Sequence, residues 1–117
     1  MKARTKAFAL DVLEFARGLP TCESLVDIQR QLTRSATAVG ANYRSACRAR
    51  SRAEFIARIG VVLEEADESA FWLEVMTEGK ICAEREAFRL LDEADQLSAI
   101  FAHSRITASA RLNRSRR

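Results

Sequence analysis

The residues of this sequence that are best suited to chemistry are arginines, five of which fall within a stretch of 15 residues. They are Arg44, Arg48, Arg50, Arg52 and Arg58. Glu54 is the only acid within the stretch. Because a guanidinium group forms paired hydrogen bonds with phosphate oxygens, this cluster predicts contact with the RNA or DNA backbone. The alternative is that these arginines pair with acids of a neighbouring subunit.

The cluster offers no sign of base recognition. Tyr43, the aromatic residue beside it, falls on the predicted inner face of its helix. Proteins that read unpaired bases stack them on aromatic side chains. The expected binding is therefore to the phosphate backbone rather than to a particular base sequence.

A second group of chemically capable residues is acidic and consists of Glu64, Glu65, Asp67 and Glu68. Di-metal sites in helical bundles combine glutamates with Glu-x-x-His pairs. The single histidine, His103, has no glutamate within three residues. The acids are therefore expected to form ion pairs on a solvated or intersubunit face, and no metal, cofactor or catalytic residue is predicted.

The three cysteines, Cys22, Cys47 and Cys82, lie too far apart for a metal-binding pair and are odd in number for a disulfide framework. We expect them to be reduced thiols, buried or half-buried. With no constellation of nucleophile and base in the sequence, the protein is not expected to be an enzyme.

The elements that must position these residues are helices. The chain has 117 residues, with one proline and four glycines, and 48% of its residues are hydrophobic. So few turn-forming residues argue against a sandwich or barrel and favour one all-α domain. Apolar residues recur at spacings of three and four, which predicts helices over roughly 4–17, 22–48, 52–78 and 83–111.

Short connections between such helices predict an antiparallel up-and-down four-helix bundle over residues 1–112, followed by a flexible basic tail, 113–117. The inner stripe of the first helix is Phe8, Val12, Phe15 and Ala16, with Leu19 beyond. That of the second is Leu25, Ile28, Leu32, Ala36, Val39, Tyr43 and Ala46. That of the third is Phe55, Ile59, Val62, Ala66, Ser69, Leu73 and Met76. That of the fourth is Phe88, Leu91, Ala94, Leu97, Phe101 and Ser104.

The helix ends carry recognisable signals. Gly18 and Gly79 are expected to end the first and third helices, and Thr21 to cap the second. Ser51 followed three residues later by Glu54 forms a capping box at the start of the third. Gly40, inside the second helix, predicts a close approach of two helices.

The third helix has more apolar surface than a monomer needs. A second stripe contains Val61, Glu65, Glu68, Trp72 and Val75. An aromatic residue mixed with carboxylates is typical of a subunit interface, so we expect a homo-oligomer. The alternative is that these residues pack under the short first helix.

Two polar residues on the second helix are given structural roles. The Asn42 amide is expected to set the register of facing helices or to cap a backbone group. Arg34 is expected to form an interhelical pair with Glu64 or Glu68.

Charge is unevenly distributed along the chain. Residues 1–60 hold 11 Lys/Arg and 5 Asp/Glu, residues 61–100 hold 3 and 11, and residues 101–117 hold 5 and none. A polyanion would therefore bind a local patch. No apolar run approaches the ~20 residues of a membrane span, and no signal peptide is recognised, so a cytoplasmic protein is expected.

The stretch 31–73 resembles the bacterial ribosomal RNA intervening-sequence proteins, often called four helix bundle proteins. The matching residues are Gln31-Leu32, Arg34-Ser35-Ala36, Gly40-Ala41-Asn42-Tyr43, Ala49-Arg50-Ser51, Phe55-Ile56, Glu64-Glu65-Ala66-Asp67-Glu68-Ser69 and Trp72-Leu73. With the first helix included, the likeness covers about residues 4–105. Many members carry an acid shortly after the Asn-Tyr pair, whereas Arg44 and Ser45 follow it here.

The resemblance implies a left-handed bundle and a ring of five subunits around a central channel. Relatives include the accessory variability protein of diversity-generating retroelements, a basic pentamer associated with a reverse transcriptase and with nucleic acid, so a protein partner of that kind is also implied. Together, the sequence and the resemblance predict a non-catalytic oligomer that binds RNA or DNA backbone. The alternative is a structural or protein-interaction ring without nucleic-acid affinity.

Overall fold

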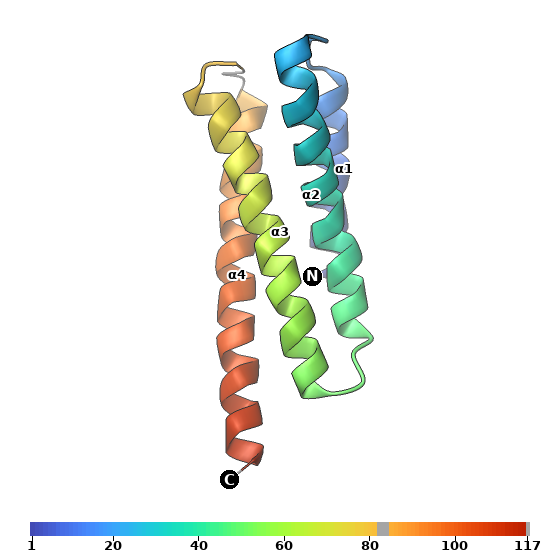
Figure 1. The fold of residues 1–117 in the computed structure, drawn as a ribbon, viewed down its shortest axis with the longest axis vertical. Helices are drawn as coiled ribbons and strands as arrows, with labels where there is room; N and C mark the ends of the chain where they lie inside the picture. Colours follow the sequence, from blue (N-terminus) through green and yellow to red (C-terminus); the bar gives the residue numbers. More distant parts are fainter. Residues whose placement is uncertain (82–84, 117) are drawn as a thin grey trace.

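The fold is a bundle of four helices. The structure is a computed structural model and describes residues 1–81 and 85–116. The helices are α1 (Lys2–Arg17), α2 (Glu23–Cys47), α3 (Arg52–Glu78) and α4 (Arg85–Ser115). They run up and down beside one another in a rod of 55 × 22 × 22 Å (Figure 1). The predicted all-α four-helix bundle is confirmed.

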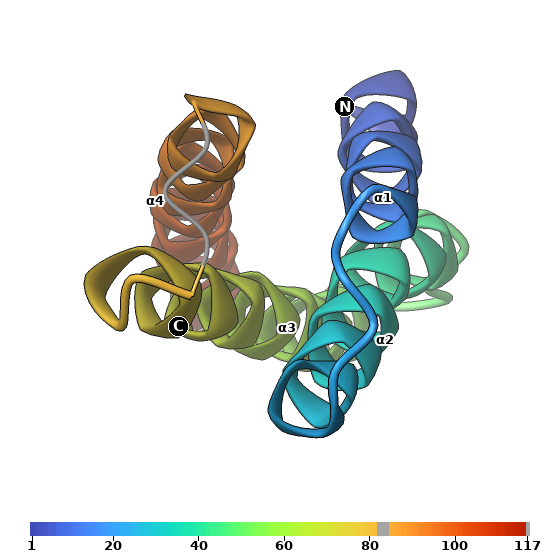
Figure 2. The ribbon, with the colours of Figure 1, turned by 90° about the horizontal axis from the view of Figure 1, so that it is seen from above.

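Each helix contacts two others. α1 packs against α2 and α4, and α3 packs against the same two helices, so that α1 and α3 lie diagonally opposite. Figure 2 looks along the bundle and shows α1 and α4 on one side with α2 and α3 on the other. Contact is most extensive where α3 meets α2 and α4, and least extensive between α1 and α4. The predicted second stripe of α3 therefore does not pack under α1.

The core confirms the inner stripes predicted for the first three helices, because every residue of those stripes is buried or half-buried. A polar contact crosses this core where the hydroxyl oxygens of Ser35 on α2 and Ser69 on α3 lie 2.9 Å apart. Both side chains are fully buried. Their mutual hydrogen bond satisfies groups that would be costly to bury alone.

The stripe predicted for α4 is partly wrong. Phe88 is 51% exposed, and the buried line runs instead through Ala87, Leu90, Ala94, Leu97 and Phe101. Spacings of three and four fit this line as well as the predicted one. The small Ala87 takes the inward position at the start of the helix, which turns Phe88 toward solvent.

The start of α3 follows the predicted capping box in part. The Ser51 hydroxyl accepts a hydrogen bond from the N–H of Glu54 at 3.1 Å. The Glu54 carboxylate accepts from the N–H of Arg50 at 2.8 Å, not from that of Ser51. The turn between α2 and α3 is thus held by two hydrogen bonds, and neither of them uses an arginine side chain.

The predicted ends of α1 and α3 are confirmed, whereas the predicted cap of α2 is not. Gly18 and Gly79 follow α1 and α3 directly. Cys22, rather than Thr21, is the N-cap of α2, and its side chain makes no capping hydrogen bond. The predicted Thr21 cap is therefore wrong by one residue.

The C-terminal arginines extend a helix. α4 continues through Ser115, where the sequence predicted a flexible tail after residue 112. The Ser115 hydroxyl donates to the carbonyl oxygen of Arg111 at 2.9 Å, and the N–H of Arg116 donates to that of Leu112 at 3.2 Å. Residues 113–115 are therefore helical.

The helices differ in length in a way that matters for function. α1 has 16 residues and α4 has 31, which at 1.5 Å per residue makes them about 24 and 46 Å long. Figure 1 shows α4 reaching past the turn between α2 and α3, while the N-terminus lies part-way along the bundle. At that end the bundle consists of α2, α3 and α4 without α1.

Candidate functional site

Most of the predicted arginine cluster lies at the end of the bundle that α1 does not reach, whereas Arg44 lines a second pocket with Lys2 and Lys6 at the start of α1. Arg44 is in the last turn of α2, Arg48 and Arg50 are in the connecting turn, and Arg52 begins α3. All four side chains are exposed. Within residues 1–81 and 85–116, none of the four forms an ion pair.

Arg58, the fifth predicted arginine, binds side chains of its own chain. Its guanidinium lies 2.9 Å from the Glu54 carboxylate and also donates to the Ser45 hydroxyl. The N–H of Arg50 and the Arg58 guanidinium, in that order, lower the pKa of Glu54. Glu54 therefore remains ionised and engaged, and it does not neutralise the four exposed arginines.

The structure adds arginines that sequence reasoning did not assign to this site. Arg111, Arg114 and Arg116 are exposed at the C-terminal end of α4, which lies at the same end of the bundle as the turn between α2 and α3 (Figure 1). The charge of these arginines is visible in the sequence, but their place in the fold was not predictable while the tail was expected to be flexible. Its helical continuation brings them to the same end of the bundle.

We call this surface the arginine end and define it by Arg44, Arg48, Arg50, Arg52, Arg111, Arg114 and Arg116. Glu54 is the only acid in residues 36–63 and 97–116, which supply this end of α2, α3 and α4. Seven cations beside one engaged carboxylate create a concentrated positive potential.

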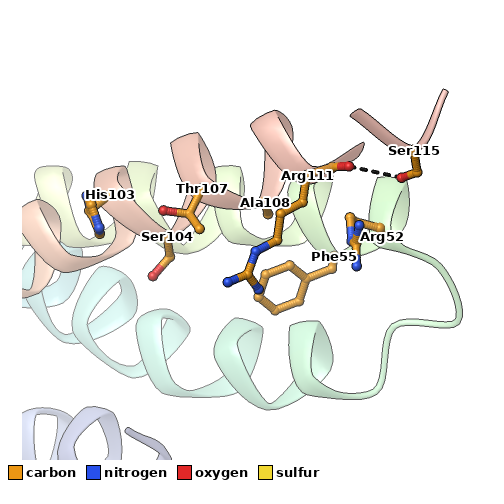
Figure 3. Close-up of a pocket in the computed structure, with 8 residues that line it drawn as sticks. All are labelled: Arg52, Phe55, His103, Ser104, Thr107, Ala108, Arg111 and Ser115. Atoms are coloured by element: carbon orange, nitrogen blue, oxygen red, sulfur yellow. Dashed lines mark hydrogen bonds between the residues drawn. The ribbon is translucent and has the colours of Figure 1, made fainter. Parts of the chain in front are cut away.

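A pocket of about 700 Å³ opens beside the arginine end. It is lined by Arg52, Phe55, His103, Ser104, Thr107, Ala108, Arg111 and Ser115. Figure 3 shows the Phe55 ring and the Arg111 side chain reaching into the same opening between α4 and α2. An aromatic ring thus lies among the arginines, contrary to the prediction that none does.

The predicted interface residues lie in two settings. Val61 is 40% exposed on the outer side of α3, and Trp72 and Val75 are half-buried. The Trp72 ring packs edge-on against that of Phe71, with ring centroids 5.0 Å apart. Phe71 is itself 53% exposed, so α3 presents an outward apolar face.

The two acids of that stripe bind Arg34 of the same chain. The Arg34 guanidinium lies 2.6 Å from the Glu68 carboxylate and 3.3 Å from that of Glu65. The Trp72 indole N–H also donates to Glu68 at 3.3 Å. Of the two partners predicted for Arg34, Glu68 is the one that binds it. Glu64 is exposed, and Glu65 binds Arg34 instead.

Asn42 does not reach a facing helix. Its amide donates to the carbonyl oxygen of Ala38 at 2.9 Å, one turn earlier in α2. Of the two roles considered for Asn42, the structure places it in the backbone-capping one and not in a register contact.

The described residues contain no cluster of His, Cys, Asp and Glu that could hold a metal ion. Cys22 and Cys47 are free thiols and are exposed, whereas the sequence predicted buried or half-buried ones. Cys82 lies outside the described residues. No helix of the described chain combines the length and apolar character needed to span a membrane.

Comparison with known proteins identifies a family and a similar solved structure. The model of the family described as 23S rRNA-intervening sequence protein matches residues 1–103. A solved structure of a protein of unknown function from the S23 ribosomal protein family of Bacteroides thetaiotaomicron superposes with a TM-score of 0.76. It is 24% identical and the match covers 89% of this chain and 96% of that one, a likeness that shows the fold. The comparison with curated proteins gives no match.

Proposed function

The chain belongs to the 23S rRNA-intervening sequence protein family, and we propose that it is a non-catalytic protein that binds the backbone of RNA or DNA. The observation that supports this function is the arginine end, where seven exposed arginines from three segments lie beside one engaged acid. Guanidinium groups form paired hydrogen bonds with phosphate oxygens and stay charged at any physiological pH.

Such binding has a measurable signature in its salt dependence. Each phosphate contact releases counterions, so the logarithm of affinity falls with the logarithm of salt concentration by about 0.7 per contact on single strands and about 0.9 on duplex DNA. Replacing three contacting arginines should therefore flatten the salt slope by about 2 to 3.

The test compares variants by fluorescence anisotropy with short single-stranded RNA, single-stranded DNA and duplex DNA at several salt concentrations. The triple variant Arg48→Gln, Arg50→Gln, Arg52→Gln keeps the exposed positions polar and leaves the Arg50 N–H bond to Glu54 in place. We expect weaker binding and a flatter salt slope with unchanged helical content by circular dichroism.

A matched control lies at the opposite end of the bundle. Arg17, Arg30 and Arg85 are exposed at the end of α1 and near the starts of α2 and α4. Changing these three to glutamine removes the same net charge but leaves the arginine end intact. The control variant should therefore lose much less affinity than the first triple variant. Equal losses for both triple variants, or no loss for the first, would show that the arginine end is not the binding surface.

A second candidate function, a structural or protein-interaction assembly, is favoured by the outward apolar face of α3. Phe71 is exposed there beside the half-buried Trp72, and Val61 is exposed about three turns earlier on the same helix. Because Arg34 already engages the two acids of this face, we propose that copies of the chain associate through its apolar side chains. The family resemblance implies five subunits.

Sedimentation velocity at several protein and salt concentrations tests this assembly and counts the subunits. An apolar interface should resist high salt, whereas an ionic one should dissociate. Trp72→Ala should shift the mass toward the monomer, and the exposed Leu10 on α1 provides a control, Leu10→Ala, that should not. A wild-type protein that is monomeric at all concentrations would contradict the proposal.

A further inference from the structure

The pocket beside the arginine end exists because α1 is short. On the upper part of α4, one face is covered by α1 through Arg4, which lies 2.6 Å from Glu93, and through Arg89, which lies 3.2 Å from Asp11. Toward the C-terminus, beyond the reach of α1, the same side of the helix lines the open pocket. The uncovered stretch of α4 is therefore an unfilled fourth place in the bundle.

Phe55 forms the apolar part of this unfilled place. It continues the line of Ile59, Val62 and Ala66 on α3, each of which is 0% exposed. Phe55 itself is only half-buried and lines the pocket, whose lining includes no residue of α1. A core position thus presents an aromatic ring at the surface.

The polar groups around this ring are free to bind a ligand. Arg52 comes from the start of α3, whereas Ser104, Thr107 and Arg111 come from α4. Across the described parts of the chain, the side chains of these four residues take part in none of the hydrogen bonds. Figure 3 shows the two α4 hydroxyls and the Arg111 guanidinium on the pocket side of that helix.

We infer that this pocket takes one unpaired nucleotide of the strand whose backbone the arginine end holds. The base stacks on the Phe55 ring, Arg52 and Arg111 bind the phosphates on either side, and the hydroxyls of Ser104 and Thr107 face the base and sugar edges. The pocket volume of about 700 Å³ falls within the usual range for small-molecule sites. Positive charge at the rim and an aromatic floor match a nucleotide better than a neutral apolar ligand.

This inference rests on the proposed function and adds a strand preference to it. Paired bases are stacked within a duplex and cannot enter the pocket, whereas an unpaired base can. The wild-type protein should therefore bind single-stranded RNA or DNA more tightly than duplex DNA of equal length at the same salt concentration.

The test uses Phe55→Leu, which keeps an apolar side chain over the core but removes the ring, and Phe55→Tyr, which keeps the ring. Since base stacking on an aromatic residue changes affinity by roughly 5- to 150-fold, Phe55→Leu should weaken single-strand binding by that factor and leave duplex binding unchanged. Phe55→Tyr should retain both. A strand carrying a fluorescent adenine analogue, whose emission falls when it stacks, should be quenched by wild type and Phe55→Tyr only.

A second pair of variants does not touch the core. Arg111→Gln should weaken single-strand binding more than duplex binding, because Arg111 lines the pocket. Arg114→Gln, one turn further on and outside the pocket lining, should weaken both equally.

Three results would overturn the inference. If wild type binds strands and duplexes equally and Phe55→Leu changes neither, the pocket is not a nucleotide site, while the proposed function stands. If Phe55→Leu weakens strands and duplexes alike, the ring acts on the fold and not on a base. If wild type binds no nucleic acid even at low salt, the proposed function fails together with the inference.

Discussion

Gly40 and Gly79 allow a test in which one substitution has opposite expected effects at two positions. A Cβ built at Gly40, in the interior of α2, lies 3.5 Å from the carbonyl oxygen of Thr5 on α1, which is an ordinary contact. A Cβ built at Gly79, at the end of α3, lies 2.6 Å from the carbonyl oxygen of Val75, which is too close. We therefore expect Gly40→Ala to stabilise the bundle and Gly79→Ala to destabilise it.

The magnitudes follow from these contacts. Glycine in a helix interior is about 0.8–1 kcal/mol less favourable than alanine, and each new van der Waals contact of the added carbon with α1 contributes about 0.1–0.2 kcal/mol. Gly40→Ala should thus add about 1 kcal/mol to the free energy of unfolding, which raises the Tm of a domain of this size by about 4 °C. At Gly79 the shift of backbone needed to relieve the overlap should cost about 1–3 kcal/mol.

Thermal and urea unfolding followed by circular dichroism measure both effects. All proteins are compared at one concentration, because the Tm of an assembling protein depends on it. If Gly40→Ala lowers the Tm, α1 and α2 approach more closely than the structure indicates. If Gly79→Ala is neutral, the end of α3 can move without cost, and the reasoning about that turn is wrong.

Three further predictions concern the polar contacts. Ser51→Ala removes the hydroxyl that accepts the Glu54 N–H, so the free energy of unfolding should fall by about 1 kcal/mol in urea titrations; no change would mean that the cap is dispensable. The Arg34 hydrogen bond lowers the pKa of Glu68, so its stabilisation is present above the ordinary value of 4.5 and is lost as the pH falls through the lowered one. Between pH 6 and pH 3 the Tm of Arg34→Gln should therefore fall less steeply than that of wild type, and parallel curves would refute the role of the pair. Arg52→Glu places an acid in the first turn of α3 and should raise stability by about 0.3–1 kcal/mol while weakening nucleic-acid binding in the anisotropy assay; a loss of stability would contradict the dipole argument.

The fold was predictable because its signals are local. The inner stripes of α1, α2 and α3 follow from apolar spacing, and Ser51 and Gly79 mark the ends of α3 within the sequence itself. Phe88 was misplaced because two lines separated by one residue fit the same spacing near the start of α4. Periodicity shows that a helix has an apolar face, but the packing partner decides which of two adjacent residues turns inward.

The candidate site was predicted only in part because it depends on relations between helices. The exposed arginines of the turn were found from charge alone, but the engagement of Arg58 required the position of Glu54 one turn before it and of Ser45 across the turn. Phe55 was correctly assigned to the inner face of α3. Its exposure depends on where α1 ends along the bundle, a relation between helices that are distant in sequence, so no local pattern in the sequence could reveal it.

The direction of the helices separates the arginines that the fold can explain from those that it cannot. Arg44 and Arg114 lie in the last turns of α2 and α4, where the helix dipole is negative and a cation stabilises the helix without any ligand. Arg52 is the first residue of α3, where the dipole is positive and a cation is unfavourable. Arg50 stands just before the Ser51 cap of the same helix, so its side chain gains nothing from that dipole either. These two arginines add to the positive potential of a helix N-terminus, and a phosphate bound there would interact favourably with both. Lys2 and Arg85 also stand first in α1 and α4, so the dipole alone does not single out Arg52. What distinguishes Arg52 is that it lines the pocket together with Phe55, where a bound phosphate would offset the cost of a cation at the helix N-terminus.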